Sequence, residues 1–468
     1  MCGIIGILSE KKDNNFYDLY EGLYHLQHRG QDSFGMSYLD VMNHIKCKKY
    51  NEMLSNVNIL EEPNFKLGIG HVRYPTSGDI TINECQPFTL TNKYHNISIV
   101  HNGQITITDK LLSFIKDKDI KIDKNITSDS IYLLYLLSYY LNQYEVLDKD
   151  ILINIISEIQ NLLEGSYNCI CIINNNSLLC FKDINSIRPL IYGKYNSGKC
   201  NDKRNNTKYM ISSESVSLTS LGYEIISDIY GKDLLYFDGI KLHILPLPGE
   251  YINKPCLFEW VYLAREESII YNVNVYKARL KMGEFLANKI IKILGDDLKN
   301  ISSIIPIPDT SKPVALSISE TLNIPYYEAI TKNRYINRTF IMNTQGKRKK
   351  NIKRKLNIIK HLVENKDIII VDDSIVRGNT IKHIINLLKE NNVGKIYVLS
   401  CSPPIINKNI YGIDIPDKED LLLYNKSIED LEKELDINLI FQDLDDLKSS
   451  INIYNPELKI FEDSIFKK

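Results

Sequence analysis

The stretch "IIIVDDSIVRGNT" (368–380) decides the fold of the second half of the chain. Residues 368–371 form a continuous apolar run, which is typical of a strand buried on both faces of a parallel sheet. The run ends in two adjacent carboxylates, Asp372 and Asp373, and a loop of small and hydroxyl residues leads into an expected helix. Because ligands of such sheets bind beyond the carboxyl ends of the strands, we expect a binding site at this loop.

Helices and strands alternate on both sides of this stretch from about residue 256 onward. Apolar runs at 302–309, 367–373 and 395–402 predict strands, and amphipathic segments between them predict helices. We therefore predict that residues 255–468 form an α/β domain with a parallel sheet and a short C-terminal extension.

The first half has a different pattern, in which several strand-like runs follow one another and are joined by helices. Residues 2–8 predict a strand, and residues 16–30 predict a helix because apolar side chains recur in them at helical spacing. Strands that pair among themselves and are then covered by helices indicate a layered α+β domain, which we assign to residues 2–240. Proline and glycine punctuate its expected end at 234–251.

Composition narrows the classes of function. The chain has 468 residues, enough for two domains, and a net charge of -1, which gives no reason to expect a nucleic-acid or membrane-surface partner. Nine cysteines include no Cys-x-x-Cys pair, which favours a reducing, cytoplasmic setting over a disulfide framework. We expect no targeting leader and no membrane span, because no apolar run approaches ~20 residues.

The loop after Asp373 has the groups that bind phosphate. Ser374, Gly378 and Thr380 offer N–H and hydroxyl donors at the start of a helix, and the two acids before them suit ribose hydroxyls and Mg²⁺. The alternative is a strand that ends in solvated acids before a turn. The order of acids, glycine and helix start favours the phosphate site.

This loop resembles the phosphoribosyl-pyrophosphate (PRPP) loop of the type I phosphoribosyltransferases. The resemblance extends to "IPIPDTSKP" (305–313), which is similar to the diphosphate-side loop, and to "TKNRYINRTFI" (331–341) with the basic residues 345–357, which are similar to a closing flap. By itself the basic segment reads as a solvated charged surface. The resemblance implies that PRPP is bound by Asp309, Thr310, Ser311, Lys332, Asp372, Asp373, Ser374, Arg377, Gly378, Asn379 and Thr380, and Mg²⁺ by Thr310, Asp372 and Asp373.

The opening "MCGIIGIL" places a cysteine at position 2, where it is either a small buried hydrophobe or a nucleophile. Five segments behind it, "HRGQDS" (28–33), "GIGHVRYPTSG" (68–78), "QPF" (86–88), "VHNGQI" (100–105) and "TSDS" (127–130), together resemble the class II glutamine amidotransferase domain. This is an N-terminal-nucleophile amidohydrolase with layered α-β-β-α architecture.

The resemblance implies a role for each matched residue. Cys2 is the nucleophile, with its own α-amine as base once Met1 is removed, since an amine of pKa ~7.7–8 is suited to accept the thiol proton. Asn102 and Gly103 form the oxyanion hole. Arg73 binds the α-carboxylate of glutamine, and Asp129 binds its α-ammonium.

A glutaminase followed by a PRPP loop resembles the amidophosphoribosyltransferases, with a further match at "CLFEWVYLARE" (256–266). The resemblance implies synthesis of 5-phosphoribosylamine from glutamine and PRPP in purine synthesis, with ammonia passing internally from Cys2 to C1 of PRPP. It also implies inhibition by purine nucleotides and a homotetramer. The alternatives are a PRPP-binding regulatory protein and a glutaminase-coupled transferase with another acceptor.

Some members of the family hold an iron–sulfur cluster on four cysteines, and we expect none here. Residues 455–468 contain no cysteine, Asn409 stands where a ligand is expected, and Cys256 alone cannot hold a cluster. The chain also departs from the family at Ser186, where a glycine is usual, at Glu266 and Glu267, and at Asn379. We expect Ser186 to strain its turn.

Overall fold

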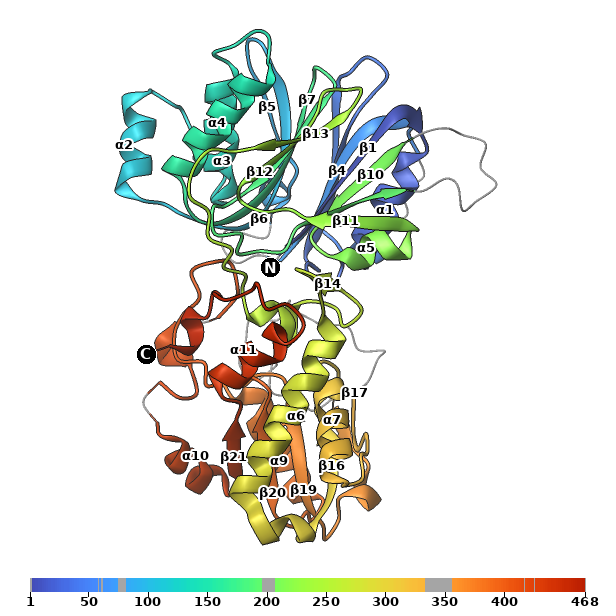
Figure 1. The fold of residues 1–468 in the computed structure, drawn as a ribbon, viewed down its shortest axis with the longest axis vertical. Helices are drawn as coiled ribbons and strands as arrows, with labels where there is room; N and C mark the ends of the chain where they lie inside the picture. Colours follow the sequence, from blue (N-terminus) through green and yellow to red (C-terminus); the bar gives the residue numbers. More distant parts are fainter. Residues whose placement is uncertain are drawn as a thin grey trace.

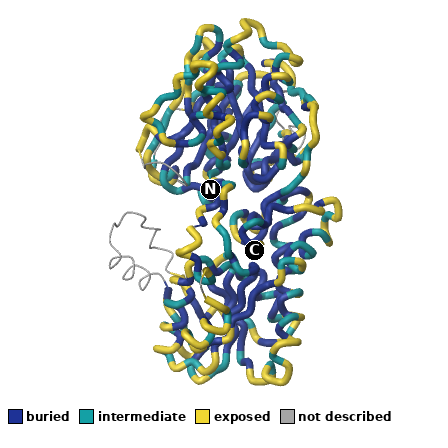
Figure 2. Tube along the Cα trace, turned by 90° about the vertical axis from the view of Figure 1, so that its left-hand side faces the viewer, coloured by how far each residue is buried: buried dark blue, intermediate teal, exposed yellow. Residues whose placement is uncertain are grey.

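The computed structural model describes residues 2–57, 59, 62–74, 81–195, 207–332, 356–415, 417–424 and 426–467. The chain forms two bodies that meet at a narrow junction, where its N-terminal end also lies (Figure 1). Buried residues fill the interior of each body separately (Figure 2).

The first sheet contains seven strands in the order β11-β9-β10-β1-β4-β2-β3, and neighbouring strands are antiparallel. The apolar run that follows Cys2 is at its centre, where Ile4, Ile5 and Ile7 are completely buried. The strands are β1 (Gly3–Asp13), β2 (Ser33–Leu39), β3 (Ile45–Tyr50), β4 (Phe65–Arg73), β9 (Ile191–Tyr195), β10 (Lys208–Ser212) and β11 (Tyr223–Asp228).

The second sheet contains six antiparallel strands in the order β13-β12-β8-β7-β6-β5. Its longest ladder joins β6 to β7, from the pair Ile97 and Ile173 to the pair Thr106 and Glu164. The strands are β5 (Phe88–Thr91), β6 (Asn96–Thr106), β7 (Glu164–Ile173), β8 (Ser177–Lys182), β12 (Asp233–Phe237) and β13 (Leu242–Pro246).

The two sheets pack face to face, because Ile4 and Ile69 of the first share one apolar core with Val100 and Ile170 of the second. Helices cover both outer faces, which confirms the predicted α-β-β-α layers (Figure 1). The first sheet is covered by α1 (Asn15–His25) and α5 (Ser215–Ser220), and the second by α3 (Ser130–Leu141) and α4 (Lys149–Leu162); α2 (Asp109–Asp117) lies beside them.

Helix α1 is shorter than the sequence predicted. It ends at His25 rather than near Gly30, and the turns that follow bring Gly30 against β4. A Cβ on Gly30 would lie 2.4 Å from the carbonyl carbon of Val72, so the turn approaches β4 too closely for any residue other than glycine at this position. The segment after α1 is instead folded beneath the end of β4.

The second half is built on the parallel sheet β16-β19-β20-β21, as predicted. Alternate side chains of its strands enter two apolar cores, so both faces are covered. The strands are β16 (Ile301–Pro306), β19 (Asp367–Asp372), β20 (Ile396–Ser400) and β21 (Asn438–Phe441), with α6 (Val275–Leu294), α7 (Lys312–Leu322) and α11 (Leu444–Asn452) on one face and α9 (Asn379–Glu390) and α10 (Ile428–Leu435) on the other.

Two further regions bear on the sequence predictions. The flap predicted at 331–341 and 345–357 lies mostly outside the described residues; its described ends form the hairpin of β17 (Ile330–Lys332) and β18 (Leu356–Ile358). Ser186 has a φ of 55°, a left-handed conformation in which a side chain is strained, and its hydroxyl accepts a hydrogen bond from Gly231 N at 2.8 Å.

Among the described residues, no helix has both the length and the apolar character to cross a bilayer.

Candidate active site

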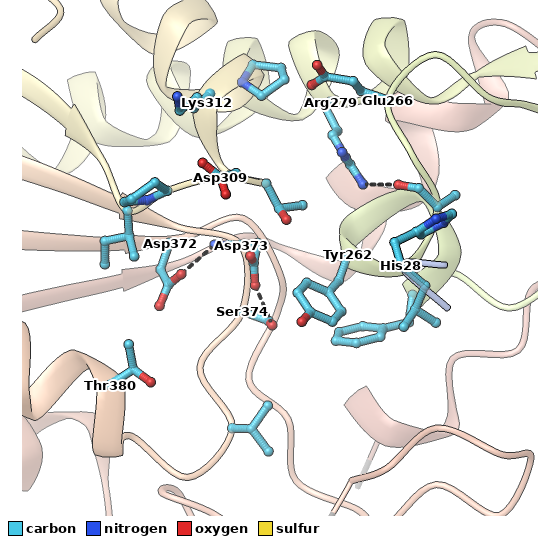
Figure 3. Close-up of a pocket in the computed structure, with 18 of the residues that line it drawn as sticks. His28, Tyr262, Glu266, Arg279, Asp309, Lys312, Asp372, Asp373, Ser374 and Thr380 are labelled. Carbon is cyan, nitrogen blue, oxygen red and sulfur yellow. Dashed lines mark hydrogen bonds between the residues drawn. The ribbon is translucent and has the colours of Figure 1, made fainter. Parts of the chain in front are cut away.

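A cavity of about 1130 Å³ opens at the carboxyl ends of β16 and β19. Its floor is the loop between β19 and α9, and one wall is the loop between β16 and α7 (Figure 3). His28, Arg29 and Tyr74 of the first half also line it. The cavity therefore lies between the two bodies and touches both.

All but one of the residues predicted to bind PRPP line this cavity. The exception is Ser311, which is completely buried and donates a hydrogen bond from Oγ to Ile307 O at 2.7 Å. Its hydroxyl therefore stabilises the backbone of the loop and does not face the cavity. The residues that line the cavity are Asp309, Thr310, Lys332, Asp372, Asp373, Ser374, Arg377, Gly378, Asn379 and Thr380.

The two adjacent carboxylates end β19. Asp373 N donates to Asp372 Oδ1 at 3.0 Å, and Ser374 Oγ donates to Asp373 Oδ1 at 2.8 Å (Figure 3). Burial, together with the neighbouring charge of Asp373, raises the pKa of Asp372 well above its usual range. A divalent cation or sugar hydroxyls at this position would relieve the repulsion between the pair.

The residues present fit a magnesium ion that is completed by substrate oxygens. Among the described residues there is no cluster of three or more His, Cys, Asp or Glu side chains placed to hold a metal by themselves. Asp372, Asp373 and Thr310 offer hard oxygen donors to one cavity. Mg²⁺ is commonly bound in this way, by one or two carboxylates together with substrate phosphates.

The loop that follows has the geometry of an anion site. Gly378 has a φ of 72° and directly precedes the twelve-residue helix α9. A Cβ on Gly378 would lie 2.7 Å from Leu422 Cδ1, and Leu422 N donates to Val376 O at 2.8 Å. Leu422 therefore packs against the loop and holds its backbone. The N–H groups at the start of α9 lie beside the cavity, where they can bind a phosphate.

The wall formed by the loop between β16 and α7, together with β17, holds both positive and negative side chains. Lys332 Nζ lies 3.0 Å from Asp309 Oδ2, and Lys312 Nζ lies 3.0 Å from Glu328 Oε2. These side chains are between about one third and two thirds exposed, so a bound anion can compete for the lysines. The hairpin of β17 and β18 supplies Lys332 at the edge of the cavity.

The predicted glutaminase residues gather where the two antiparallel sheets meet. Gly3 of β1 is paired with Val72 of β4, which brings Cys2 beside Arg73 at the ends of these strands. Cys2 is half-buried, with Sγ 3.7 Å from Tyr74 O, and Arg73 is buried. Asn102 and Gly103 lie on β6 of the facing sheet.

Asn102 is buried, and neither polar atom of its side chain has a hydrogen-bond partner among the described residues. A buried amide in this state is available for a ligand. Gly103 has a φ of 150°, and a Cβ there would lie 2.1 Å from Ser166 O. Asp129 Oδ2 accepts a hydrogen bond from Ile105 N at 2.6 Å, which fixes this carboxylate two residues beyond Gly103.

Sequence reasoning missed the polar residues that support these groups. Gln86 Oε1 accepts from His101 N at 2.6 Å, and Gln86 Nε2 donates to Ser130 Oγ at 3.0 Å. Glu84 accepts from the backbone of Thr127 and Ser128, which holds the segment before Asp129. Gln86 and Ser130 belong to the "QPF" and "TSDS" segments, so those motifs were the available signal; Glu84 gave none.

Two buried histidines lie near Asn102, and their surroundings favour the neutral ring. Burial lowers the pKa of His71 well below its usual range, and burial also lowers the pKa of His101. His101 Nδ1 lies 2.7 Å from Ser130 Oγ. Neither residue was assigned a role from the sequence, and the lowered pKa values disfavour positive charge on either ring.

A buried chain of charges joins the two bodies, and it too was missed. Arg29 pairs with Glu214 and, at 2.7 Å, with Glu259 of the connecting segment, and Glu259 lies 3.3 Å from Arg188 Nη1. All four side chains are at most 3% exposed. Arg29 lies in "HRGQDS" and Glu259 lies in "CLFEWVYLARE". Both segments carry the family resemblance, so this resemblance was the available signal.

Comparison with known proteins agrees with this geometry. The family model of the phosphoribosyl transferase domain matches residues 274–401. The amidophosphoribosyltransferase of Haemophilus influenzae is 37% identical over all of this chain and 92% of its own length, and that of Schizosaccharomyces pombe is 35% identical over all of this chain and 89% of its own.

Among solved structures, the glutamine PRPP amidotransferase of B. subtilis in complex with ADP and GMP superposes with a TM-score of 0.81 at 26% identity, covering 96% of this chain and 92% of that one. A structure described as the allosteric regulatory enzyme of purine biosynthesis gives a TM-score of 0.82 at the same identity, covering 96% and 91%. Because the full-length identity exceeds a third and the cavity and strand ends hold the matching residues, this chain belongs to the amidophosphoribosyltransferase family.

Proposed function

We propose that the chain catalyses the reaction of its family, in which glutamine, PRPP and water give 5-phosphoribosylamine, glutamate and diphosphate. The observation that carries this proposal is the shared cavity, since one space is lined by the PRPP loop at Asp372 and Asp373 and by Arg29 and Tyr74 of the other half. An enzyme that passes nitrogen between two sites needs such a shared space.

The first step is glutamine hydrolysis in the N-terminal half, which the sequence assigned to residues 2–240 and whose second sheet also includes β13 up to Pro246. Once Met1 is removed, the α-amine of Cys2 accepts the thiol proton, and Sγ attacks the amide carbon. Asn102 Nδ2 and Gly103 N–H donate to the oxyanion that forms. Collapse releases ammonia and leaves a thioester, which water hydrolyses to glutamate. Arg73 binds the α-carboxylate, and Asp129 binds the α-ammonium.

The second step takes place in the C-terminal half, assigned to residues 255–468. Ammonia forms a bond to C1 of PRPP as the bond from C1 to the diphosphate oxygen breaks, and the amine then loses a proton to water. Ser374, Arg377, Gly378, Asn379 and Thr380 hold the 5-phosphate, and Asp372 with Asp373 orients the ribose hydroxyls. Asp309, Lys332 and the backbone around Ser311 face the diphosphate.

Thr310, Asp372 and Asp373 would hold Mg²⁺, and the ion would supply positive charge to balance that of the leaving diphosphate. This role fits the paired carboxylates and the oxygen-only donor set of the cavity.

Ammonia is most useful to this reaction if it stays away from bulk water. At neutral pH free ammonia is mostly ammonium, which has no lone pair to attack C1. His28, Arg29 and Tyr74 extend the cavity toward the first half, and Tyr74 O is 3.7 Å from Cys2 Sγ. We therefore propose that ammonia crosses inside the molecule, along this side of the cavity.

Regulation and assembly follow by analogy with the relatives. The B. subtilis structure was obtained with ADP and GMP, which supports inhibition of this chain by purine nucleotides. A homotetramer and a cytoplasmic location are proposed on the same family basis, with no nucleic-acid or membrane partner. The absence of an iron–sulfur cluster stays a prediction, supported by the use of Asn409 Oδ1 to accept two backbone N–H groups.

The function is tested with the purified full chain, PRPP and MgCl₂. We expect diphosphate release with glutamine or with ammonium chloride at alkaline pH, and none when both are left out. Glutamate should appear in equal amount to diphosphate when glutamine is the donor. A chain that binds PRPP but releases no diphosphate under either condition is a regulatory protein, and one that releases diphosphate with another acceptor is a different transferase.

A further inference from the structure

A loop of the C-terminal half packs against the peptide that follows Gly103, one of the two residues predicted to form the oxyanion hole of the N-terminal half. A Cβ on Gly412 would lie 3.0 Å from both the carbonyl carbon and the oxygen of Gly103, and 3.4 Å from Gln104 N. Gly412 has a φ of 93°, so its backbone also favours glycine. We name residues 409–414 the clasp loop.

On its other side Gly103 is closed by β7, since a Cβ there would lie 2.1 Å from Ser166 O. The backbone of Gly103 is therefore held between Ser166 and Gly412. Ser166 belongs to the same arrangement, because its Oγ donates to Tyr411 O at 2.7 Å and accepts from Gln104 N at 3.3 Å. One hydroxyl thus joins the clasp loop to the residue that follows Gly103.

The clasp loop is fixed by Asn409, whose side chain is buried. Its Oδ1 accepts hydrogen bonds from Tyr411 N at 2.9 Å and from Ile413 N at 3.0 Å. These bonds span Gly412 on both sides and set the path of the backbone there. Tyr411 O also accepts from Arg188 Nε at 3.0 Å, and Ile413 is anchored in the apolar core of the second half.

From this placement we propose that Asn409 and Gly412 are positioning residues for the glutaminase, acting through Gly103. An oxyanion hole stabilises charge in proportion to how accurately its donors are preorganised. The donor N–H of Gly103 belongs to a residue with no side chain to anchor it, so its orientation depends on how the backbone on either side is held. The contacts of Gly412 fall on the C=O of Gly103 and on Gln104 N, the peptide directly after the donor. The clasp loop supplies that packing from the other half of the chain. This inference rests on the proposed function.

The test is Gly412→Ala in the full-length protein. The added methyl group must push the carbonyl of Gly103 by a few tenths of an ångström. We therefore expect kcat for glutamine hydrolysis to fall about tenfold to 10²-fold, less than the roughly 10²- to 10³-fold that complete loss of one oxyanion donor costs. KM for glutamine should change less than twofold, because Arg73 and Asp129 are untouched. Synthesis with ammonia should stay within twofold of the unaltered chain.

Gly222→Ala is the matched control. Gly222 also has a left-handed φ, of 78°, but a Cβ there would meet its nearest neighbour, Tyr195 Cε2, at an ordinary 3.7 Å. This variant reports the cost of backbone strain alone. It should leave kcat and KM for glutamine hydrolysis and the rate of synthesis with ammonia unchanged. Equal losses in Gly412→Ala and Gly222→Ala would overturn the proposal, because strain would then explain both.

A second pair of variants separates positioning from folding. Asn409→Ala removes the acceptor of two N–H groups, whereas Asn409→Asp keeps it, so the alanine variant should lose kcat for hydrolysis and the aspartate variant should recover most of it. The alkylation rate of Cys2 with iodoacetamide should be the same in both. An unchanged kcat in Gly412→Ala, or a parallel loss of ammonia-dependent synthesis, contradicts the proposal. If the unaltered chain makes no product even with ammonia, the proposed function fails instead.

Discussion

The guanidinium of Arg29 and the carboxylate of Glu259 form a buried ion pair with Nη2 and Oε2 2.7 Å apart, although 230 residues separate them. Arg29 comes from the turn after α1, and Glu259 comes from the segment that connects the two halves. Arg188 approaches the same carboxylate from the other side. The junction is therefore held by charges that have no access to water.

Glu259→Gln should destabilise the protein, because two buried arginines lose their shared counter-charge. Removal of one partner of a buried pair costs about 3–5 kcal/mol. Glu267→Gln is the control, since the pair it forms with Arg265 is more than 40% exposed and contributes less than about 1 kcal/mol. Urea unfolding monitored by tryptophan fluorescence measures both, because Trp260 is buried at this junction. Equal shifts in the two variants would contradict a structural role for the buried pair.

Cys2→Ala should abolish synthesis with glutamine and leave synthesis with ammonia largely intact. The substitution removes the nucleophile and leaves every residue proposed to bind PRPP in place; it alters only the contact of Cys2 Sγ with Tyr74 O at the edge of the cavity. The measurement is diphosphate release with each nitrogen donor. Cys47→Ala, at an exposed cysteine on β3, is the control and should leave both activities unchanged. Loss of both activities in Cys2→Ala would show that the two sites are not separable.

Asp372→Asn and Asp373→Asn should have the opposite effect. Each removes a carboxylate proposed to orient ribose and metal, so synthesis with either nitrogen donor should fall about 10²-fold or more, while basal glutamine hydrolysis persists. Synthesis by the unaltered chain should also stop on chelation with EDTA and return with MgCl₂. Asp296→Asn, at a fully exposed position, serves as the control. Ammonia-dependent synthesis at the usual rate in either variant would mean that the second site is misplaced.

Asp228 predicts a dependence of stability on pH. It is buried, and burial raises its pKa to about 6, although Tyr271 N donates to its Oδ1 at 3.1 Å. Between pH ~4 and ~6 the folded state holds a proton that the unfolded state has released, so the free energy of unfolding falls as pH rises. The fall is on the order of 2–3 kcal/mol, since one pKa unit is 1.36 kcal/mol. The positive charge of buried Lys182 lowers the pKa of Asp228, but burial outweighs it.

Asp228→Asn should remove this dependence, because the amide does not titrate. The measurement is the free energy of unfolding of both proteins at pH 4, 5, 6 and 7. The free energy of unfolding of the unaltered chain minus that of the variant should decrease between pH 4 and pH 6 and level off between pH 6 and pH 7, where Asp228 is deprotonated in both states. A constant difference would show that Asp228 has the same pKa in both states.

Much of the second site could be predicted from the sequence. The run 368–380 identified a strand, two acids and a phosphate loop within one local stretch. Because ligands of parallel sheets bind beyond the carboxyl ends of the strands, the loop after this strand was expected to be the binding site. Ser311 shows the limit of this reasoning. It stands between two cavity-lining residues, yet its hydroxyl turns inward to Ile307 O, a choice made by local backbone geometry rather than residue type.

The first site was harder to predict, because its residues come from separate strands. Cys2, Arg73 and Asn102 were identified by their motifs, but nothing local to the sequence states that β1 and β4 face β6 across a core. Glu84 and Glu214 were missed for the same reason. Their partners lie 43 and 185 residues away in the chain. The sequence alone therefore does not reveal that Glu84 accepts backbone hydrogen bonds or that Glu214 is a buried counter-charge.

The sequence by itself determined the two halves, their layered and parallel sheets, and the chemical groups at each strand end, since these depend on local periodicity and on residues that are neighbours in the chain. The tertiary structure decided how the halves meet: Arg29 against Glu259, Tyr74 at the edge of the PRPP cavity, and Gly412 on Gly103. Such contacts depend on packing between surfaces hundreds of residues apart, where a few tenths of an ångström separate a fit from a clash.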